Sequence, residues 1–414
     1  MALIRPFAAY RPAPGREERI AALPYDVYNR EEATQVVKGN PDSFLTIDRA
    51  ETGFGPEVDT YAPQVYERAS RLLQEKIAAG DFVKESSPCF YLYEQTFQGR
   101  SQTGIAACAS IDDYLDNTIK KHENTRAEKE QDRIRHVDVC NMQTGPIFLA
   151  YRTNDTMRDI TAQVKEDKPV YDFVAEDGVG HRVWVIEDTA TIQRISECFE
   201  QIPALYIADG HHRCASAVKV GLMRRDAHPD YTGEEEFNYF LSVLFADEEL
   251  RILDYNRVVR DLNGYSEDAF IEKIAESFVV EERGSAACRP GRKGTFGMYL
   301  NGQWYHLTAR EHILSKDVVE GLDVALLQRH LLEPVLGITD PKTDKRIDFV
   351  GGIRGLEELE RRVHTDMKVA FAMYPTSIGE LFQVADSGML MPPKSTWFEP
   401  KLRSGLFLHD LEIR

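Results

Sequence analysis

The spacing of apolar residues constrains this fold most, because along the chain it changes repeatedly between a period of two and a period of about 3.6. A period of two is typical of β-strands, and a period of about 3.6 is typical of amphipathic α-helices. The strand-like and helix-like segments do not alternate with the regularity of a doubly wound sheet. The pattern therefore predicts an α+β protein.

Three hairpins and five helices can be assigned from this pattern and its turn residues. The hairpins pair 89–93 with 104–108, 170–174 with 182–186, and 295–300 with 303–307. Asn301-Gly302 in the third hairpin favours a type I′ turn. The predicted helices are 61–79, 189–201, 211–225, 267–277 and 324–336.

The sequence predicts two domains, 1–245 and 246–414. A strand at 237–245 is followed by the acidic run Asp247-Glu248-Glu249, and a second set of strands and helices begins after it. The segment 389–406 is rich in proline, lysine and aromatic residues, which disfavours a plain helix. We expect it to pack back on the protein as a closing strap of the second domain.

Composition excludes several classes of protein. The chain has 414 residues, 43% of them hydrophobic, and a formal charge of −18, so wholesale disorder and nonspecific nucleic-acid binding are both disfavoured. No secretory signal or membrane-spanning run is visible, and the six cysteines lack C-x-x-C spacing. We expect a soluble cytoplasmic protein with a small-molecule partner and no nucleic-acid or membrane partner. The oligomeric state, including a homo-oligomer, stays open.

The segment 204–217 is the first candidate site. An apolar strand runs into Asp209-Gly210-His211-His212-Arg213, and a helix of small residues follows at once. Glycine lets the backbone approach a ligand, the amides at a helix start favour an anion, and arginine suits a phosphate. Asp209 could bind magnesium or orient a histidine, and either histidine could act on a proton. Alternatively, Asp209 only caps the helix, the histidines are solvated and Arg213 makes a surface ion pair.

A second candidate lies around His122-Glu123, within residues 120–135, which hold six basic and four acidic residues. One of the two residues could act as a general base, and the cations could support a phosphate. Arg126 occupies the position where a helical zinc motif needs its second histidine, so such a site is not predicted. The alternative is a solvated, charged helix.

Two weaker candidates lie near the ends of the chain. Asp26, in Pro24-Tyr25-Asp26-Val27, could hold magnesium or a substrate hydroxyl, or it could simply form a turn. In 391–403, prolines space Lys394, Lys401 and Arg403 around two aromatic residues. This composition suits a loop that closes over an anionic ligand, or else a strap that fills a gap in the core.

The standard nucleotide motifs are absent from the sequence. It contains no G-x-x-x-x-G-K-[ST] phosphate loop, no G-x-G-x-x-G fingerprint and no G-x-S-x-G elbow. Any nucleotide must therefore be held in another way.

Several of these motifs, in this order along the chain, resemble the bacterial and archaeal family called domain of unknown function 1015. The matching residues are Arg5-Pro6-Phe7, Pro24-Tyr25-Asp26-Val27, Lys121-His122-Glu123-x-Thr125, Asp132-Arg133, Gly145-Pro146-Ile147-Phe148, Asp209-Gly210-His211-His212-Arg213 and Pro392-Pro393-Lys394-Ser395-Thr396.

The segment from Asp209 to Arg213 is also similar to the nucleotide motif of the ParB and sulfiredoxin superfamily, and to its variant in free serine kinases. This resemblance covers residues 1–245 and implies a ParB/sulfiredoxin-like mixed core with insertions, followed by an additional C-terminal α+β domain. It implies that Gly210, His211, His212 and Arg213 bind phosphate and that Asp209 assists magnesium. The acidic base of the serine kinases has no matched position, which leaves Glu123 or Asp26.

The predicted function is a magnesium-dependent phosphotransferase that acts between ATP or ADP and a small hydroxyl-bearing metabolite such as free serine, as a kinase or in the reverse direction. Lys394 and Lys401 are expected to help hold the nucleotide. The alternative is a nucleotide-binding regulatory switch of ParB-like type without metabolite chemistry. Arg213→Ala is expected to abolish nucleotide binding and leave the fold intact. A nuclease would need a basic groove, which the charge of −18 disfavours.

Overall fold

The computed structural model describes residues 1–412. The chain divides into two compact units: unit 1 contains Met1–Leu250 and the residues from Pro400 onward, and unit 2 contains Arg251–Glu399. The predicted boundary at 245/246 lies close to the first junction. The return of the chain to unit 1 at Pro400 was not predicted, and it divides the predicted strap 389–406 between the two units.

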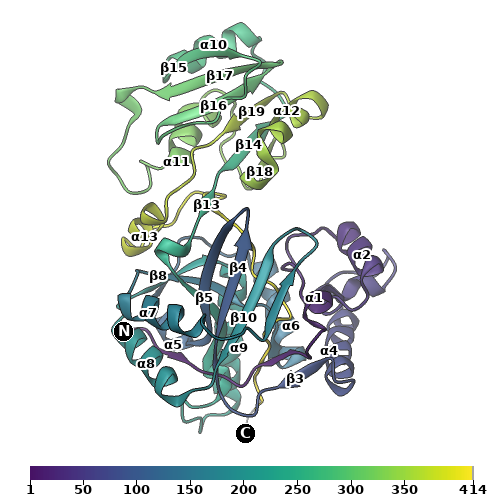
Figure 1. Cartoon of the computed structure of the whole chain (residues 1–414). Helices are drawn as coiled ribbons and strands as arrows, with labels where there is room; N and C mark the ends of the chain where they lie inside the picture. Colours follow the sequence, from purple (N-terminus) through teal and green to yellow (C-terminus); the bar gives the residue numbers. More distant parts are fainter. Residues whose placement is uncertain (413–414) are drawn as a thin grey trace. The chain divides into compact units, whose positions relative to one another are not determined.

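Unit 1 is built on a mixed nine-stranded sheet (Figure 1). Two neighbouring pairs of strands, β6 with β11 and β8 with β12, are parallel, and the others are antiparallel. In spatial order the strands are β6 (Ile119–Lys120), β11 (Leu205–Asp209), β8 (Ile147–Tyr151), β12 (Tyr239–Ala246), β5 (Arg100–Ser110), β4 (Phe90–Phe97), β10 (Gly180–Ile186) and β9 (Tyr171–Val174), with β1 (Ile4–Arg5) also paired to β5.

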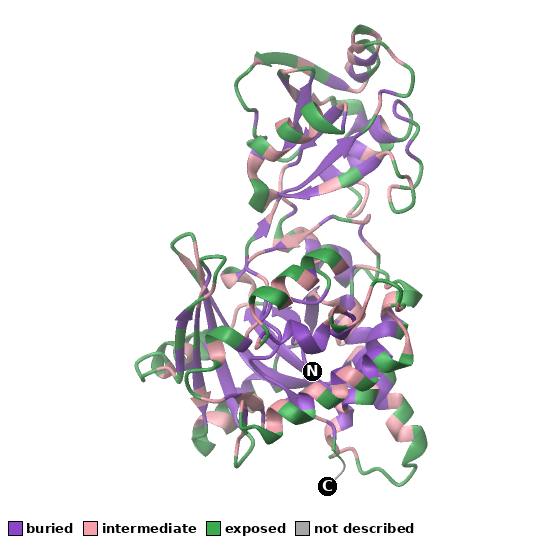
Figure 2. Cartoon of the chain, turned by 90° about the vertical axis from the view of Figure 1, so that its right-hand side faces the viewer, coloured by how far each residue is buried: buried purple, intermediate pink, exposed green. Residues whose placement is uncertain are grey.

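Three helices cover one face of this sheet: α7 (Asp155–Val164), α8 (Thr189–Glu200) and α9 (His211–Ala227). Their apolar residues, such as Ile160 and Phe199, form one buried cluster with strand residues such as Leu149. In Figure 2 the sheet strands are almost wholly buried. The short helix α5 (Ile111–Leu115) follows β5 and contacts α9.

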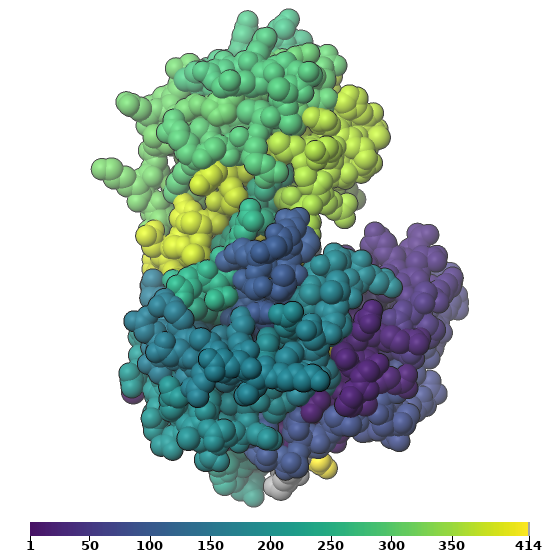
Figure 3. Space-filling view, in the orientation of Figure 1, coloured from purple at the N-terminus to yellow at the C-terminus, as the bar shows by residue number. Residues whose placement is uncertain are grey.

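The N-terminal helices form a second core around Phe44, Leu45 and Leu73. These helices are α1 (Glu17–Ile20), α2 (Arg30–Gly39), α3 (Leu45–Asp48), the 3-10 turn η1 (Ala50–Gly53) and α4 (Pro63–Ala78). In Figure 3 they form the purple and blue surface of unit 1, and α1 contacts β9. The helix α6 (Ala127–Cys140) packs against both α4 and α9 and so links the two cores.

The C-terminal segment is part of unit 1. Its strand β21 (His409–Asp410) pairs antiparallel with β7 (Met142–Gln143), and Leu408 exchanges backbone hydrogen bonds with Tyr10 on β2 (Tyr10–Pro12), which itself pairs with β3 (Phe82–Lys84). The buried ring of Phe407 lies 5.1 Å from the ring of Tyr91. These contacts anchor the segment that carries Lys401.

Unit 2 contains a six-stranded antiparallel sheet and a two-stranded ribbon of β13 (Ile252–Leu253) and β20 (Trp397–Phe398). In order, the six strands are β15 (Phe278–Gly284), β17 (Gln303–Ala309), β16 (Thr295–Leu300), β19 (Val369–Ala372), β14 (Tyr255–Val259) and β18 (Ile347–Gly351). The helices are α10 (Glu267–Ala275), α11 (Asp323–Leu327), α12 (Gly355–Thr365) and α13 (Ile378–Asp386).

The structure confirms that the protein is mixed α/β, with all three predicted hairpins present. Asn301 and Gly302 both have positive φ, 48° and 81°, as a type I′ turn requires. The predicted helix at 324–336 is wrong in its second half, because α11 ends at Leu327 and continues as the π-helical turn η5 (Gln328–Leu332). Across residues 1–412, no helix has both the length and the apolar character needed to cross a membrane.

Candidate functional site

The turn between β11 and α9 positions the central motif. Gly210 is the N-cap of this 17-residue helix with φ +90°, and no side chain caps the helix. A Cβ at Gly210 would lie 3.0 Å from Nη2 of Arg213, so both the backbone conformation and the space require glycine. The alternative that Asp209 only caps the helix is therefore wrong, since the N-cap is Gly210, and no side-chain acceptor for the first amides of α9 is found among residues 1–412.

Asp209 lies between two cations. Its Oδ2 is 3.4 Å from Nη2 of Arg213 and 3.6 Å from Nζ of Lys401. Burial alone would raise the pKa of Asp209, but the charges of Lys401 and Arg213 together lower it from its ordinary value. Asp209 is consequently ionised at neutral pH, and two positive groups remain together at the start of α9.

Arg213 also contacts the protein itself. Its side chain is only 11% exposed, and its Nη1 donates a hydrogen bond to the carbonyl of Pro146, just before β8. Gly145 lies beside the same guanidinium, since a Cβ at Gly145 would be 3.6 Å from that Nη1. Contrary to the expectation from the sequence, Arg213→Ala should therefore lower the stability of the fold, because the truncation would leave the Pro146 carbonyl without this donor.

The two histidines of the motif connect the loop 121–126 to the start of α9 through hydrogen bonds. The backbone N–H of Arg126 donates to Nε2 of His212 at 2.9 Å, and that of His122 donates to Nε2 of His211 at 3.5 Å. Because Nε2 is the acceptor in each case, a neutral ring carries its proton on Nδ1. His211 and His212 thus position the second predicted cluster beside the first.

All three histidines are kept neutral. Burial lowers the pKa of His122 to about 4, lowers that of His211 well below its ordinary value with a further contribution from His122, and lowers that of His212. The rings of His122 and His211 meet edge to face at 4.5 Å. His122 is 2% exposed, and its buried Nδ1 has no hydrogen-bond partner among residues 1–412. It lies at the site but is enclosed, while Glu123 beside it is half-buried.

The N-terminal motif lies at the same place. The guanidinium of Arg133 stacks on the ring of Tyr25 at 4.0 Å, and Arg133 pairs with Asp132 at 2.9 Å. Asp26 is exposed, and within the described part of the chain its carboxylate makes no hydrogen bond or ion pair. Its negative charge acts on His212 and raises the pKa of that ring against the effect of burial.

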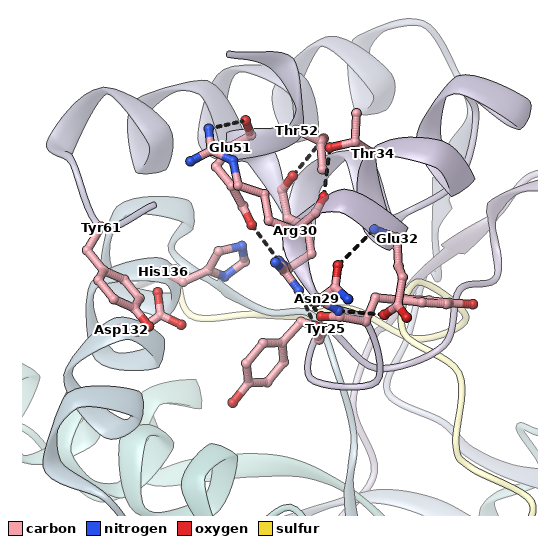
Figure 4. Close-up of polar contacts among 12 residues, drawn as sticks. Tyr25, Asn29, Arg30, Glu32, Thr34, Glu51, Thr52, Tyr61, Asp132 and His136 are labelled. Atoms are coloured by element: carbon pink, nitrogen blue, oxygen red, sulfur yellow. Dashed lines mark hydrogen bonds and ion pairs between the residues drawn. The ribbon is translucent and has the colours of Figure 1, made fainter. Parts of the chain in front are cut away.

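Two cavities adjoin these residues. A small one of about 30 Å³ is lined by residues that include Arg213, Gly145 and Ser404. A larger one of about 220 Å³ is lined by residues that include Asp26, Asp132 and Tyr61. Figure 4 shows the larger cavity's surroundings. The residues that line both cavities are Tyr25, Asp48, Arg133 and His136.

Sequence reasoning missed Asp48, His136 and Tyr66. They come from α3, α6 and α4, and each is a single residue outside any motif. One signal was available for α6, because Lys129, Asp132, Arg133 and His136 share one face at helical spacing. The alternative of a solvated, charged helix predicts that this face is exposed. Asp132, Arg133 and His136 are instead buried.

Of the cations in the predicted strap, Lys401 reaches this site from within unit 1. Lys401 contacts Asp209 as described, whereas Lys394 belongs to unit 2, where its ammonium lies 5.5 Å from the ring of Tyr255. Arg403 is buried and pairs with Asp177 at 2.6 Å. Trp397 packs edge to face on Tyr255 at 4.9 Å.

Among residues 1–412, no three His, Cys, Asp or Glu side chains form a group that could hold a metal ion. Asp209 offers one carboxylate. This is not an all-protein magnesium cage, but one carboxylate with phosphate oxygens and waters is a common magnesium arrangement.

Known structures resemble this chain at low similarity. A free serine kinase in complex with AMP is 13% identical with a TM-score of 0.37, covering 73% of this chain and 91% of the kinase. A conserved hypothetical protein from Pyrococcus furiosus is 16% identical with a TM-score of 0.36, at 73% and 94% coverage. SbnI with a C-terminal truncation, from Staphylococcus aureus, is 9% identical with a TM-score of 0.39, at 72% and 85% coverage. At such TM-scores, function has to be inferred from this chain's own residues.

The sequence comparisons give one result for the family. No curated protein matches the chain. The family described as "Protein of unknown function (DUF1015)" matches residues 4–325. Since this match covers most of the sequence, the chain belongs to the DUF1015 family.

Proposed function

We propose that unit 1 is a nucleotide-binding phosphotransferase of ParB/sulfiredoxin-like type. It transfers a phosphoryl group between ATP or ADP and a small hydroxyl-bearing metabolite such as free serine, as a kinase or in reverse, and it acts in the cytoplasm. The observation that carries the proposal is the uncapped start of α9 at Gly210, flanked by Arg213 and Lys401. Free helix amides with two cations form a binding site for phosphates.

A bound phosphate would compete with Asp209 for both cations. Arg213 and Lys401 each approach Oδ2 of Asp209 at 3.4–3.6 Å, which is looser than a charge-assisted hydrogen bond of about 2.8 Å. Both contacts with Asp209 are therefore loose enough for a phosphate, a stronger acceptor, to replace them. Lys394, also predicted to bind the nucleotide, stays a prediction.

We propose that Asp26 is the general base that receives the proton of the acceptor's hydroxyl group. In the forward reaction the acceptor's O–H proton moves to the Asp26 carboxylate, and the hydroxyl oxygen forms a bond to the terminal phosphorus. The bond from that phosphorus to the bridging oxygen breaks, and its electron pair leaves with ADP or AMP. Asp26 suits this role because it is exposed and makes no hydrogen bond or ion pair within residues 1–412. Glu123 is the alternative base, and the enclosed His122 is a positioning residue.

Magnesium, if bound, would be held by Asp209 together with phosphate oxygens and waters. It would supply charge neutralisation on the phosphates. Asp209 fits this role because it is ionised at neutral pH and lies at the phosphate end of the site.

The regulatory switch is the second candidate, and one contact favours it. His212 holds the loop 121–126 through the N–H of Arg126. A nucleotide that moves His212 would release this loop, so binding alone could change the conformation of unit 1.

The test is a product assay. The purified full chain is incubated with magnesium, ATP or ADP, and a panel of amino acids, hydroxy acids and polyols that includes serine, and phosphorylated products are detected by mass spectrometry. A product lost in Asp26→Asn, with nucleotide affinity retained, supports the proposal. No product from the whole panel would contradict phosphoryl transfer, and nucleotide binding with a change in loop 121–126 would then favour the switch.

A further inference from the structure

We propose that the cavity of about 220 Å³ beside the phosphate site is the acceptor pocket, and that it selects a hydroxyl-bearing primary amine through Asp48. This inference rests on the proposed function for the identity of the reaction. It adds the place of the second substrate and the charged group that the substrate must carry.

The pocket lies between one face of α6 and the N-terminal helices. Asp132 and His136 project from α6, and Tyr61 precedes α4 (Figure 4). Asp48 on α3 and Ala69 on α4 also line the pocket. The smaller cavity shares Asp48 and His136 with this pocket and reaches Arg213. The two cavities are therefore neighbours with shared lining residues, and the smaller one also includes the side chain proposed to hold phosphate.

Most charges in the pocket wall are already paired. Arg133 pairs with Asp132 at 2.9 Å, and Arg49 pairs with Glu51 at 2.6 Å. Asp132 also accepts a hydrogen bond from the hydroxyl of Tyr66 at 2.9 Å. These pairs cancel one another, so the groups that remain decide what the pocket binds.

Asp48 is a second buried carboxylate near Arg133, whose guanidinium already pairs with Asp132. Its side chain is 3% exposed, and its Oδ1 accepts a hydrogen bond from Oγ1 of Thr144 at 2.9 Å. Its Oδ2 accepts none from the described residues. His136 lies 3.9 Å from Oδ1, but its Nε2 donates to the carbonyl of Ile47, and burial lowers the pKa of the ring, so it is neutral. A buried carboxylate that lines a cavity, with one oxygen that accepts no hydrogen bond from residues 1–412, favours a cation there.

The rest of the wall fits an ammonium group joined to a hydroxyl. Tyr25, Tyr61 and Tyr66 line the cavity with aromatic rings that suit a small cation, although Arg133 already lies over the Tyr25 ring and the Tyr66 hydroxyl donates to Asp132. Asp26, the proposed base, lines the same pocket. Lys129 hydrogen-bonds only the hydroxyl of Tyr61, at 3.3 Å, among residues 1–412, so it could also receive a carboxylate. The expected ligand is therefore a hydroxyl-bearing amine, which is either an amino alcohol or a hydroxy amino acid.

Direct binding tests this assignment without any nucleotide. The full chain is titrated calorimetrically with ethanolamine, L-serine, glycerate and glycerol. We expect at least one of the two amines to bind at least about tenfold more tightly than glycerate and glycerol, and Asp48→Asn, which keeps the shape, to abolish that preference. Glu31→Gln, on the exposed first turn of α2, is the matched control and should change nothing. If Lys129 recognises a carboxylate, Lys129→Met should lower the affinity for L-serine and leave the affinity for ethanolamine unchanged.

Three outcomes would overturn the assignment: equal affinity for glycerate and the amines, no binding of any of the four probes, or full amine affinity in a folded Asp48→Asn. If Asp48→Asn fails to fold, Thr60→Trp at the cavity wall replaces it, because the indole should block the amine. ATP affinity is measured in the same variants and should stay within about twofold of wild type. Failure of ATP to bind the wild type would instead contradict the proposed function, so the two failures are distinguishable.

Discussion

Arg213 shows, at the scale of one residue, how a ligand-binding side chain can also be structural. It spans the carbonyl of Pro146 and the carboxylate of Asp209 from the first turn of α9. A planar guanidinium can bridge two acceptors in this way, whereas an ammonium is a compact point charge. Removing the charge and removing the fork should therefore have different effects.

Arg213→Lys tests this distinction. We expect it to weaken nucleotide affinity about tenfold, because the fork is lost, and to cost only about 1 kcal/mol of unfolding free energy. Arg213→Ala should cost about 2–3 kcal/mol, since Asp209 and Pro146 then lose a partner. Calorimetric titration and urea unfolding measure both effects. If either folded variant bound nucleotide with wild-type affinity, Arg213 would have a purely structural role.

His122 predicts a pH dependence of stability. Its pKa is about 4 in the folded protein against an ordinary value of 6.5, so between these pH values the unfolded chain binds more protons. The contribution of His122 to stability should thus be constant above about pH 6.5 and be lost progressively as the pH drops toward 4. At pH 5 the cost from this residue is about 2 kcal/mol.

Urea unfolding at pH 7 and pH 5 measures this cost. His122→Gln should lose about 2 kcal/mol less than wild type between the two pH values, while His228→Gln, at an exposed position, should behave as wild type. Parallel losses in all three proteins would show that His122 is not held neutral.

Residue by residue, the sequence predicted the site where chemistry-bearing residues are contiguous. Asp209 to Arg213 and His122 are brought together by backbone-to-ring hydrogen bonds. Asp48 could not be found, because it meets the residues of α6 only through tertiary packing, and the helical spacing of His136 on α6 did not show by itself that its face is buried. The placement of Lys394 in unit 2 likewise depends on where the chain leaves one unit for the other.

At the scale of elements, the start of α9 depends on Gly210. A Cβ there would be strained by φ +90° and would lie 3.0 Å from Arg213. We expect Gly210→Ala to cost about 1–2 kcal/mol and to weaken nucleotide binding at least about tenfold.

Gly80→Ala is the matched control for that variant. Gly80 has φ +78° at the end of α4, and no atom lies within 4 Å of the position that a Cβ would take, so the substitution has the same backbone cost away from the site. Urea unfolding and nucleotide titration compare the two variants. Equal nucleotide affinity in both would mean that the β11–α9 turn does not contact the nucleotide.

Local patterns predicted elements well where one face is apolar and a turn residue ends the run. The helix α4, which is followed by Gly80, and the hairpin of β16 and β17 with its Asn301-Gly302 turn meet this condition. The π-helical turn after α11 could not be predicted, because its sequence continues a helical pattern. The order of the nine strands in the sheet of unit 1 also has no local signal, since sequence neighbours such as β11 and β12 are separated there by β8.

At the scale of the whole molecule, the net charge of −18 conceals a local gathering of cations. Arg213 and Lys401 converge on Asp209 although they are far apart in the sequence. Lys401 reaches this place because the C-terminal segment returns to unit 1, anchored by Phe407 and β21. Composition alone could not show this return, which is a property of the tertiary fold.

Phe407→Ala tests the anchoring role of that segment. Phe407 is fully buried between Tyr91 and Tyr93, so we expect a loss of about 3–5 kcal/mol and faster amide hydrogen exchange in β7. Val279→Ala, at a 42% exposed position in unit 2, should change stability by less than about 0.5 kcal/mol. Unchanged exchange in β7 would show that the segment is not needed to hold unit 1 together.

The affinity of the full chain for adenosine, AMP, ADP and ATP tests the central claim most directly, because only the phosphates differ. If the start of α9 with Arg213 and Lys401 holds phosphate, affinity should rise with the first phosphate by at least about tenfold and be highest for ADP or ATP. Adenosine binding as tightly as ADP and ATP, or no binding of any of the four, would contradict the account.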